Sequence, residues 1–464
     1  MRKNRLYIFP AFIPLVEILP WLLAAVGGLA GIVQYFREKM QPRHRKILLT
    51  VTLLCLATAA GIVLWQRHIN PSREQGTQMT APEKLPALKM VGSAPLPVRV
   101  LVPEEHAVFT PLWVRDTETE TLSVPIVTHG LYMVGTFGDT VEARDVATGA
   151  PVWTLQKKEP VFSGFTVAGD TAFVGEGLHT AINSALTAYS LPDGKPIWQR
   201  EFLGHLESAP AVDENKGRLW ISSGPGGLWA LDIKDGDVLW HKKIGHTDCT
   251  PLLVKGALYA AAQPDEEFKE TILYKMDYGD GKTDWTLKLP GGSMGSPTIG
   301  QDLSQVLLTT AIGQVGPPQP SDKGWAHAVN RLGTLEWTVE LPGMPLPESS
   351  VVRRANLVVI TMKSGNLVAL DLKDGSKRWE AKVTDKIYAA AGLVEKTSPP
   401  MIVVMATDGT VSFLNALDGR ELHRLFVGQG GYASPYYANG VLYITAPRKI
   451  YAYGGLQQLA GRAE

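Results

Sequence analysis

The hydrophobic pattern of the chain changes once along its length. Residues 15–36 and 47–65 are nearly continuous apolar stretches, whereas the segments after about residue 122 alternate apolar and polar positions between Gly, Asp and Pro. An uncharged run of nineteen residues, 47–65, is close to the ~20 that an α-helix needs to cross a bilayer. Alternation with a period of two is typical of half-buried β-strands. The pattern predicts a membrane anchor followed by an all-β domain.

The anchor is predicted to occupy residues 1–68, with transmembrane helices at about 15–36 and 47–65. Glu17 and three prolines weaken the first span. The segment 37–46 between the spans carries five Lys or Arg residues, and the positive-inside rule places such a segment in the cytoplasm. The all-β domain is therefore expected outside the cytoplasm, in the periplasm or extracytoplasmic space, held at the inner (cytoplasmic) membrane.

Two other interpretations of the N-terminal segment, a cleaved signal peptide and a lipid anchor, fit the sequence less well. A cleaved signal peptide would need a small-residue cleavage site after the first apolar segment, where a second apolar segment follows instead. A lipid anchor at Cys55 would need a small residue before it, and Leu54 stands there. Gly27 and Gly31 have the G-x-x-x-G spacing that lets helices approach closely, so self-association through the anchor stays open.

A linker is predicted at 69–105, where six prolines and the lack of apolar periodicity indicate a semi-extended tether. The all-β domain is predicted at 106–456, followed by a tail at 457–464.

A repeat with the spacing Gly-x-x-x-Trp runs through the all-β domain. Its members are Gly149/Trp153, Gly194/Trp198, Gly236/Trp240, Gly281/Trp285, Gly333/Trp337, Gly375/Trp379 and, with the aromatic replaced by histidine, Gly419/His423. Successive tryptophans lie 45, 42, 45, 52 and 42 residues apart, which is the period of a four-stranded propeller blade. The glycines supply the positive φ of a tight hairpin between the third and fourth strands. We expect each Trp to point from the outer strand into the space between blades.

Seven complete units account for the chain to about residue 431. Residues 432–454 supply only three further strands, whereas residues 110–116 form an isolated strand with Trp113 in the marker position. Sharing the last blade between both ends closes the ring and removes free sheet edges. The prediction is an eight-bladed β-propeller whose last blade is closed by an N-terminal strand.

The repeat resembles the PQQ-repeat, or quinoprotein-like, β-propeller superfamily, in segments such as 208–240 and 433–454. One branch of it comprises PQQ-dependent dehydrogenases, which carry an adjacent cysteine pair under the quinone. The only cysteines here are Cys55 and Cys249, so the resemblance implies no quinone cofactor and no enzyme of that kind. The other branch looks like BamB, a periplasmic propeller of outer-membrane barrel assembly that binds partners. Two membrane spans depart from the lipid anchor of BamB.

Candidate chemistry outside the repeat is sparse. Lys plus Arg and Asp plus Glu both number 45, so no net field favours nucleic acid. The segment His246–Cys249 offers His, Asp and Cys but no second ligand pair at metal-site spacing, and Asp277, Asp280 and Asp284 fall on a repeated hairpin turn. The glycine-rich segment 222–227 links two strands and does not open a helix. The sequence predicts no catalytic, metal or cofactor site.

Departures from the repeat point to a binding face. Loops between the second and third strands are expanded at 176–184, 263–270 and 313–324, and they should emerge on the same face as the connections between blades. Insertions on one side of a repeat array commonly mark a binding face, although neutral drift is the alternative. The side chains expected to contact a partner are Phe268, Trp325, Met344 and Leu346, with an acidic rim of Gln263, Asp265, Glu266 and Glu267.

These features predict a protein-binding scaffold in an envelope or membrane protein complex. Two alternatives remain. One is an atypical quinoprotein or other propeller enzyme with a site in the central channel, for which the small, neutral innermost strands give little support. The other is a ligand-sensing module that signals through the helices.

Overall fold

The computed structural model describes residues 88–90, 110–264, 269–293, 295–300, 302–313, 317–384 and 386–460. The two predicted spans lie outside these residues. Within the described part of the chain, no helix has the length and apolar character needed to cross a bilayer. The chain divides into two compact units, residues 1–78 and 79–464, and the all-β domain lies in the second.

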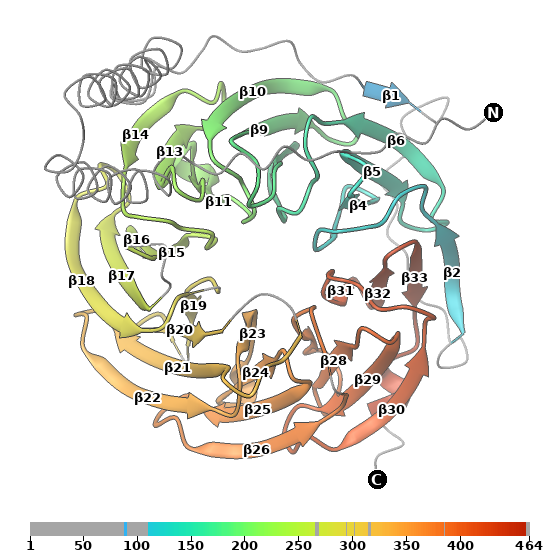
Figure 1. Cartoon of the computed structure of the whole chain (residues 1–464). Helices are drawn as coiled ribbons and strands as arrows, with labels where there is room; N and C mark the ends of the chain where they lie inside the picture. Colours follow the sequence, from blue (N-terminus) through green and yellow to red (C-terminus); the bar gives the residue numbers. More distant parts are fainter. Residues whose placement is uncertain are drawn as a thin grey trace, which may run out of the picture. The chain divides into compact units, whose positions relative to one another are not determined.

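Eight antiparallel sheets succeed one another around a ring, as predicted (Figure 1). The innermost strands are β3 (Ile126–Thr128), β7 (Phe165–Ala168), β11 (Ala211–Asp213), β15 (Leu252–Val254), β19 (Thr298–Ile299), β23 (Pro345–Val352), β27 (Gly392–Val394) and β31 (Tyr436–Ala438). The second strands are β4 (Leu131–Gly135), β8 (Thr171–Gly175), β12 (Arg218–Ser222), β16 (Ala257–Ala262), β20 (Gln305–Ile312), β24 (Leu357–Met362), β28 (Met401–Met405) and β32 (Val441–Ala446).

The third strands are β5 (Thr140–Asp145), β9 (Asn183–Ser190), β13 (Leu228–Asp232), β17 (Glu270–Asp277), β21 (Lys323–Asn330), β25 (Asn366–Asp371), β29 (Thr410–Asn415) and β33 (Lys449–Tyr453). The outermost strands are β6 (Pro151–Gln156), β10 (Pro196–Leu203), β14 (Val238–Lys242), β18 (Thr283–Pro290), β22 (Leu335–Leu341), β26 (Lys377–Lys382), β30 (Glu421–Phe426) and β2 (Pro111–Asp116). Blades 1 to 8 are numbered in this order. Short 3-10 turns η2 (Glu214–Lys216) and η3 (Arg353–Ala355) and a terminal turn α3 (Gln457–Ala460) complete the described elements.

Blade 8 contains both ends of the propeller, as the sequence predicts. Strand β2 pairs with β33, with Trp113 opposite Ala452. Trp113, Tyr132 and Tyr443 share a hydrophobic cluster that joins blade 8 to blade 1, and Tyr132 Oη lies 2.6 Å from Thr445 Oγ1 across the same joint. The ring is therefore closed by both backbone pairing and side-chain packing.

The hydrophobic core lies between blades. Most clusters combine the second and third strands of neighbouring blades, such as Val141 and Ala143 of blade 1 with Ala172 and Val174 of blade 2. Because these strands are buried on both faces, their sequences are nearly continuous apolar runs. Strand β4, for example, is buried at every position.

The tryptophan markers form the rim of these joints. In six of them the indole N–H donates to a backbone carbonyl of the next blade: Trp113 to Val146 (3.0 Å), Trp153 to Pro192 (2.7 Å), Trp198 to Ile233 (2.9 Å), Trp285 to Arg331 (3.0 Å), Trp337 to Leu372 (3.0 Å) and Trp379 to Ala416 (3.0 Å). The hairpin glycine of the next blade lies against each indole, so that a Cβ added at Gly194 would be 2.6 Å from the ring of Trp153. We call this arrangement the Trp–Gly clasp.

The predicted linker is not wholly free of secondary structure. Strand β1 (Leu88–Met90) lies within it and pairs antiparallel with β6, extending blade 1 to five strands. A three-residue strand is too short for its alternation to be read from the sequence, and its register is set by the exposed edge of β6.

Candidate functional site

The candidate site lies on the face of the ring where the second strand of each blade turns to the third and where each outermost strand leads into the next blade. We call it the connector face. Strands β8, β16 and β20 end on this face and β9, β17 and β21 begin there, so the three expanded connections, 176–182 in blade 2, 263–269 in blade 4 and 313–322 in blade 5, start and finish on it. The Asp277–Asp284 turn lies on the opposite face and is structural: Asp277 Oδ1 accepts from Gly279 N at 2.7 Å, and Asp284 pairs with Lys275.

The structure buries several of the residues expected to contact a partner. Met344 and Leu346 are 6% and 7% exposed. The segment from Pro345 belongs to strand β23 and not to a connection, because Leu346 packs into the core between blades 6 and 7. Gln263 is 3% exposed, and Trp325 is half-buried within β21. These side chains offer a partner little surface.

The other four residues expected to contact a partner lie outside the described residues. They are Asp265, Glu266, Glu267 and Phe268, in the segment 265–268. Their contact role stays a prediction.

Other apolar side chains are exposed on the connector face. They lie at the ends of strands or in connections on this side of blades 1, 2, 5, 7 and 8: Phe137 (41%), Ile182 (76%), Leu203 (49%), Ile312 (43%), Phe426 (69%) and Tyr432 (47%). The ring of Tyr432 stacks on that of Tyr388 at 5.2 Å between centroids, and the Lys386 ammonium lies 4.5 Å from the centre of the Tyr388 ring. The face thus presents apolar and aromatic surface around the ring.

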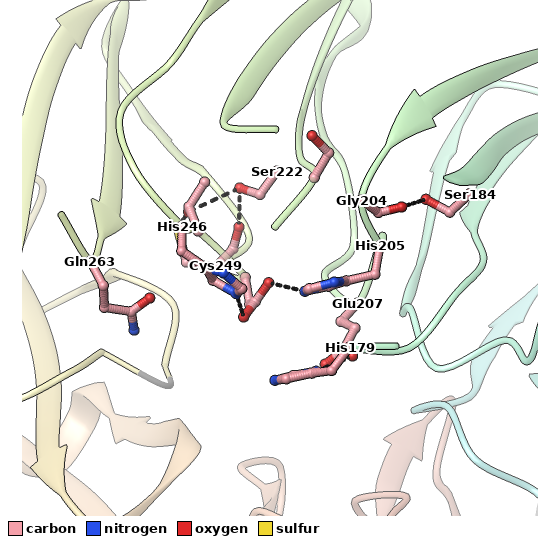
Figure 2. A network of polar contacts seen from close by, with 12 residues as sticks. His179, Ser184, Gly204, His205, Glu207, Ser222, His246, Cys249 and Gln263 are labelled. Atoms are coloured by element: carbon pink, nitrogen blue, oxygen red, sulfur yellow. Dashed lines mark hydrogen bonds and ion pairs between the residues drawn. The ribbon is translucent and has the colours of Figure 1, made fainter. Parts of the chain in front are cut away.

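A cluster of histidines and carboxylates occupies the connector face at blades 2, 3 and 4 (Figure 2). His179 belongs to the expanded loop of blade 2. His205 and Glu207 belong to the connection from blade 2 to blade 3, and His246 and Asp248 to the connection from blade 3 to blade 4. We call these five residues the histidine cluster.

The carboxylates hold the imidazoles together. Asp248 Oδ1 lies 2.8 Å from His205 Nε2, and Asp248 Oδ2 lies 2.8 Å from His246 Nε2. Glu207 pairs with His179 Nδ1. The rings of His179 and His205 are stacked, with centroids 4.8 Å apart and planes inclined by 6° (Figure 2). The side chain of His179 is 54% exposed, and that of His205 is 3% exposed.

The backbone fixes the deeper members of the cluster. His246 and Gln263 exchange two backbone hydrogen bonds of 2.9 and 2.8 Å, and Thr247 and Gly224 exchange two of 3.0 and 3.1 Å. The connection that carries His246 and Asp248 is thereby held between blades 3 and 4. Glycine at position 224 leaves room for the His205 ring, because a Cβ there would be 2.6 Å from His205 Nε2. Gln263, expected on a rim, supports the cluster through its backbone.

The hydrogen bonds within the cluster favour the ionised form of the Asp248 carboxylate. Burial alone would raise the pKa of Asp248, but the hydrogen bonds from His205 and His246 outweigh burial and hold that pKa far below its ordinary value. The hydrogen bond to Glu207 raises the pKa of His179, although burial opposes it. Burial raises the pKa of the neighbouring Cys249 thiol, so this cysteine is not an activated nucleophile.

The sequence predicts no metal site at His246–Cys249, because it holds no second ligand pair at metal-site spacing. The structure supplies that pair from the preceding connection. The signal is present in the sequence: Gly204-His205-Leu206-Glu207-Ser208 and Gly245-His246-Thr247-Asp248-Cys249 repeat the order Gly-His-x-acid one blade apart. Both glycines have positive φ, +95° and +102°, so the two connections turn alike into the cluster.

The family model described as "Outer membrane protein assembly factor BamB" matches residues 137–267, 267–407 and 322–458, which is most of the propeller. The chain belongs to this family. Curated relatives with that name include proteins from Moranella endobia, 27% identical over 229 residues (46% of this chain and 52% of the relative), and from Burkholderia pseudomallei, 24% identical over 278 residues (55% and 65%). The match to the Yersinia pestis protein, 25% identical, covers 41% of that relative. The chain thus spans less than two thirds of each of these BamB relatives.

Solved structures show the same fold at lower identity. BamB from Moraxella catarrhalis superposes with a TM-score of 0.57 at 15% identity, covering 74% of this chain and 99% of that one. Quinohemoprotein alcohol dehydrogenase from Comamonas testosteroni gives 0.57 at 14% identity, covering 76% and 77%. The propeller architecture is therefore shared by a BamB protein and by an enzyme, and the fold does not decide between binding and catalysis.

Proposed function

We propose that this chain is a membrane-anchored, extracytoplasmic propeller that binds proteins of an envelope complex related to outer-membrane protein assembly. The observation that carries the proposal is the family match over residues 137–458 on a closed eight-bladed ring. Residues 1–68 are proposed as an inner-membrane anchor, and 69–105 as a linker that leaves the propeller in the periplasm. The charge distribution around the apolar segments supports this orientation.

The connector face is proposed as the binding surface. Its exposed Ile182, Phe426 and Tyr432 supply apolar anchors of the kind that dominate protein interfaces, and its loops differ in length around the ring. A non-catalytic role is supported by the absence of an adjacent cysteine pair from the sequence.

The experiment is a crosslinking pull-down of the full-length protein from membranes, with partners identified by mass spectrometry. Phe426→Ser combined with Tyr432→Ser removes apolar surface from the connector face without touching a buried ion pair. Replacement of the whole 313–324 loop would be less clean, because Asp322 pairs with Lys363 at 3.0 Å with both side chains 5% exposed. We expect the double variant to lose captured barrel-assembly or other envelope proteins.

Leu332→Ser is the matched control, since Leu332 is 83% exposed in the hairpin between β21 and β22 on the opposite face. It should capture the same proteins as the unmodified chain. Equal loss in both variants, or loss in neither, would contradict binding through the connector face.

A further inference from the structure

The histidine cluster has the composition of a metal-binding site. Two overlapping groups meet at His205: His179, His205 and Glu207 form one, and His205, His246 and Asp248 form the other. Within each group, one potential ligand atom per residue lies within 4.8 Å of the others. Imidazole nitrogen and carboxylate oxygen are donors for zinc and neighbouring first-row divalent ions.

We propose that His179, His205, His246 and Asp248 bind one divalent transition-metal ion, with Zn²⁺ as the representative, and that Glu207 orients His179. This site is independent of the proposed protein-binding function, and it would join blade 2 to the connections of blades 3 and 4.

The positions of the donor atoms support three of these ligands, His205, His246 and Asp248. Both imidazole Nε2 atoms lie 2.8 Å from separate oxygens of Asp248, so the two nitrogens and the carboxylate already converge. Ligands of a tetrahedral zinc ion with bonds of about 2.0 Å are roughly 3.3 Å apart. The separations among these three ligands run from 2.8 to at most 4.8 Å, so each needs to change by no more than about 1.5 Å.

His179 can be the fourth ligand once its ring turns out of the stack with His205, because a metal ion lies in the plane of each imidazole that it binds and these two planes are inclined by only 6°. Its side chain is half-exposed in the loop 176–182, and its ring lies 4.8 Å from that of His205 and 6.2 Å from that of His246. Glu207 engages Nδ1, which leaves Nε2 as the coordinating nitrogen. A carboxylate on the second nitrogen of a liganding histidine is the usual outer-shell arrangement of zinc sites.

The surroundings restrict the site to nitrogen and oxygen donors. Cys249 follows Asp248, but its Sγ lies 3.3 Å from Thr247 Oγ1 and accepts the Ala261 N–H at 3.3 Å, inside a buried joint. The backbone bonds of His246 and Thr247 hold the connection in this orientation. A thiolate ligand would require the connection to turn over.

The test is calorimetric titration of the full-length protein, freed of any affinity tag, with Zn²⁺ at neutral pH. We expect one ion per chain. Asp248→Asn and His246→Ala should weaken binding by at least about 100-fold, because each removes a direct ligand, and Glu207→Gln by about 10- to 100-fold, because it removes an outer-shell partner. The ion should also raise the thermal unfolding temperature of the unmodified protein.

His179→Ala guards against loss of fold, since this side chain is half-exposed in a loop. The variant should keep the unfolding temperature of the metal-free protein and lose the increase caused by Zn²⁺. His129→Ala is the matched control. His129 pairs with Asp170 at 2.9 Å outside the cluster, and its variant should bind Zn²⁺ normally.

Three results would overturn the proposal: no saturable binding of one ion per chain, binding that persists in Asp248→Asn and His246→Ala, or equal loss in His129→Ala. X-ray absorption of the zinc-loaded protein provides a separate check. It should show only nitrogen and oxygen neighbours at about 2.0 Å, and a sulfur neighbour at about 2.3 Å would refute the ligand assignment.

Discussion

The Trp–Gly clasps at the rim and the histidine cluster on the connector face are built from the same repeat in opposite ways. The clasps use one residue pattern in almost every blade, and each joins an outer strand to the next hairpin. The cluster uses a pattern found in two consecutive connections, to which the loop of blade 2 adds one histidine. The repeated clasps at the rim stabilise the ring. The histidine cluster departs from the repeat at one place on the connector face, and the ring does not need it for stability.

This difference assigns separate roles to the two regions. Changes in a clasp should reduce stability wherever they are made, because each clasp completes a buried joint between blades. Changes among the accessible members of the cluster should alter binding while leaving the ring intact. Single substitutions in each region can test that division.

Trp153→Ala should have the largest effect. Trp153 is completely buried, packs against Tyr189 and donates to the Pro192 carbonyl. Its truncation leaves a cavity and an unpaired carbonyl, and we expect a loss of about 3–5 kcal/mol in the free energy of unfolding. Chemical denaturation measures this loss. Trp240→Ala is the comparison: Trp240 is half-buried, and its Nε1 has no hydrogen-bond partner among the described residues, so its variant should lose less.

His327 should make the propeller less stable in acid. This histidine is buried between Thr310 and Thr338, each 3.0 Å from a ring nitrogen, and burial lowers its pKa to about 4. Because the unfolded chain takes up the proton near pH 6.5, stability is fully present above that pH and falls as the pH drops from about 6.5 to 4. The loss is at most about 3 kcal/mol.

His327→Gln should reduce this acid-dependent loss in unfolding experiments at pH 7 and pH 4.5. An unchanged pH dependence would show that other groups cause it. The contrast with the histidine cluster is chemical: His327 has hydroxyl partners and stays neutral, whereas the cluster histidines have carboxylate partners.

Gly194→Ala separates the clasp from backbone strain. Gly194 has φ +70°, and an added Cβ would press on Trp153. Gly217 has nearly the same φ, +63°, with nothing within 4 Å of an added Cβ. Both substitutions should cost about 1–2 kcal/mol for the left-handed backbone. The Gly194 variant should cost at least about 1 kcal/mol more in the same denaturation assay, through its clash with the indole; equal costs would show that the clasp contributes no tight packing.

His179→Ala should have the smallest effect on stability. Its partner Glu207 is mostly buried, but His179 itself is 54% exposed, so we expect the thermal unfolding temperature of the metal-free protein to change by no more than about 1–2 °C. A large fall in this unfolding temperature would show that His179 helps to hold the blades together. It would contradict the separation of roles between the rim and the cluster.

The sequence predicts the clasps well because each is marked by a local, repeated spacing. Trp113 in the closing strand could be identified for the same reason. The burial of Leu346 was not predictable from loop-like Pro and Gly residues, since the core between blades 6 and 7 decides it. Met344, just before β23, is buried as well. The histidine cluster was missed because its ligands come from separate connections. His205 and His246 are 41 positions apart and become neighbours only when adjacent blades are placed side by side.

The most direct test of the central claim, that partners bind the connector face and not the opposite face, is site-specific photo-crosslinking in cells. A photoreactive amino acid would replace either Phe426 on the connector face or Leu332 on the opposite face of the full-length protein. We predict crosslinks to envelope proteins from position 426 and none of these from position 332. Crosslinks to the same proteins from position 332, with none from position 426, would contradict the claim.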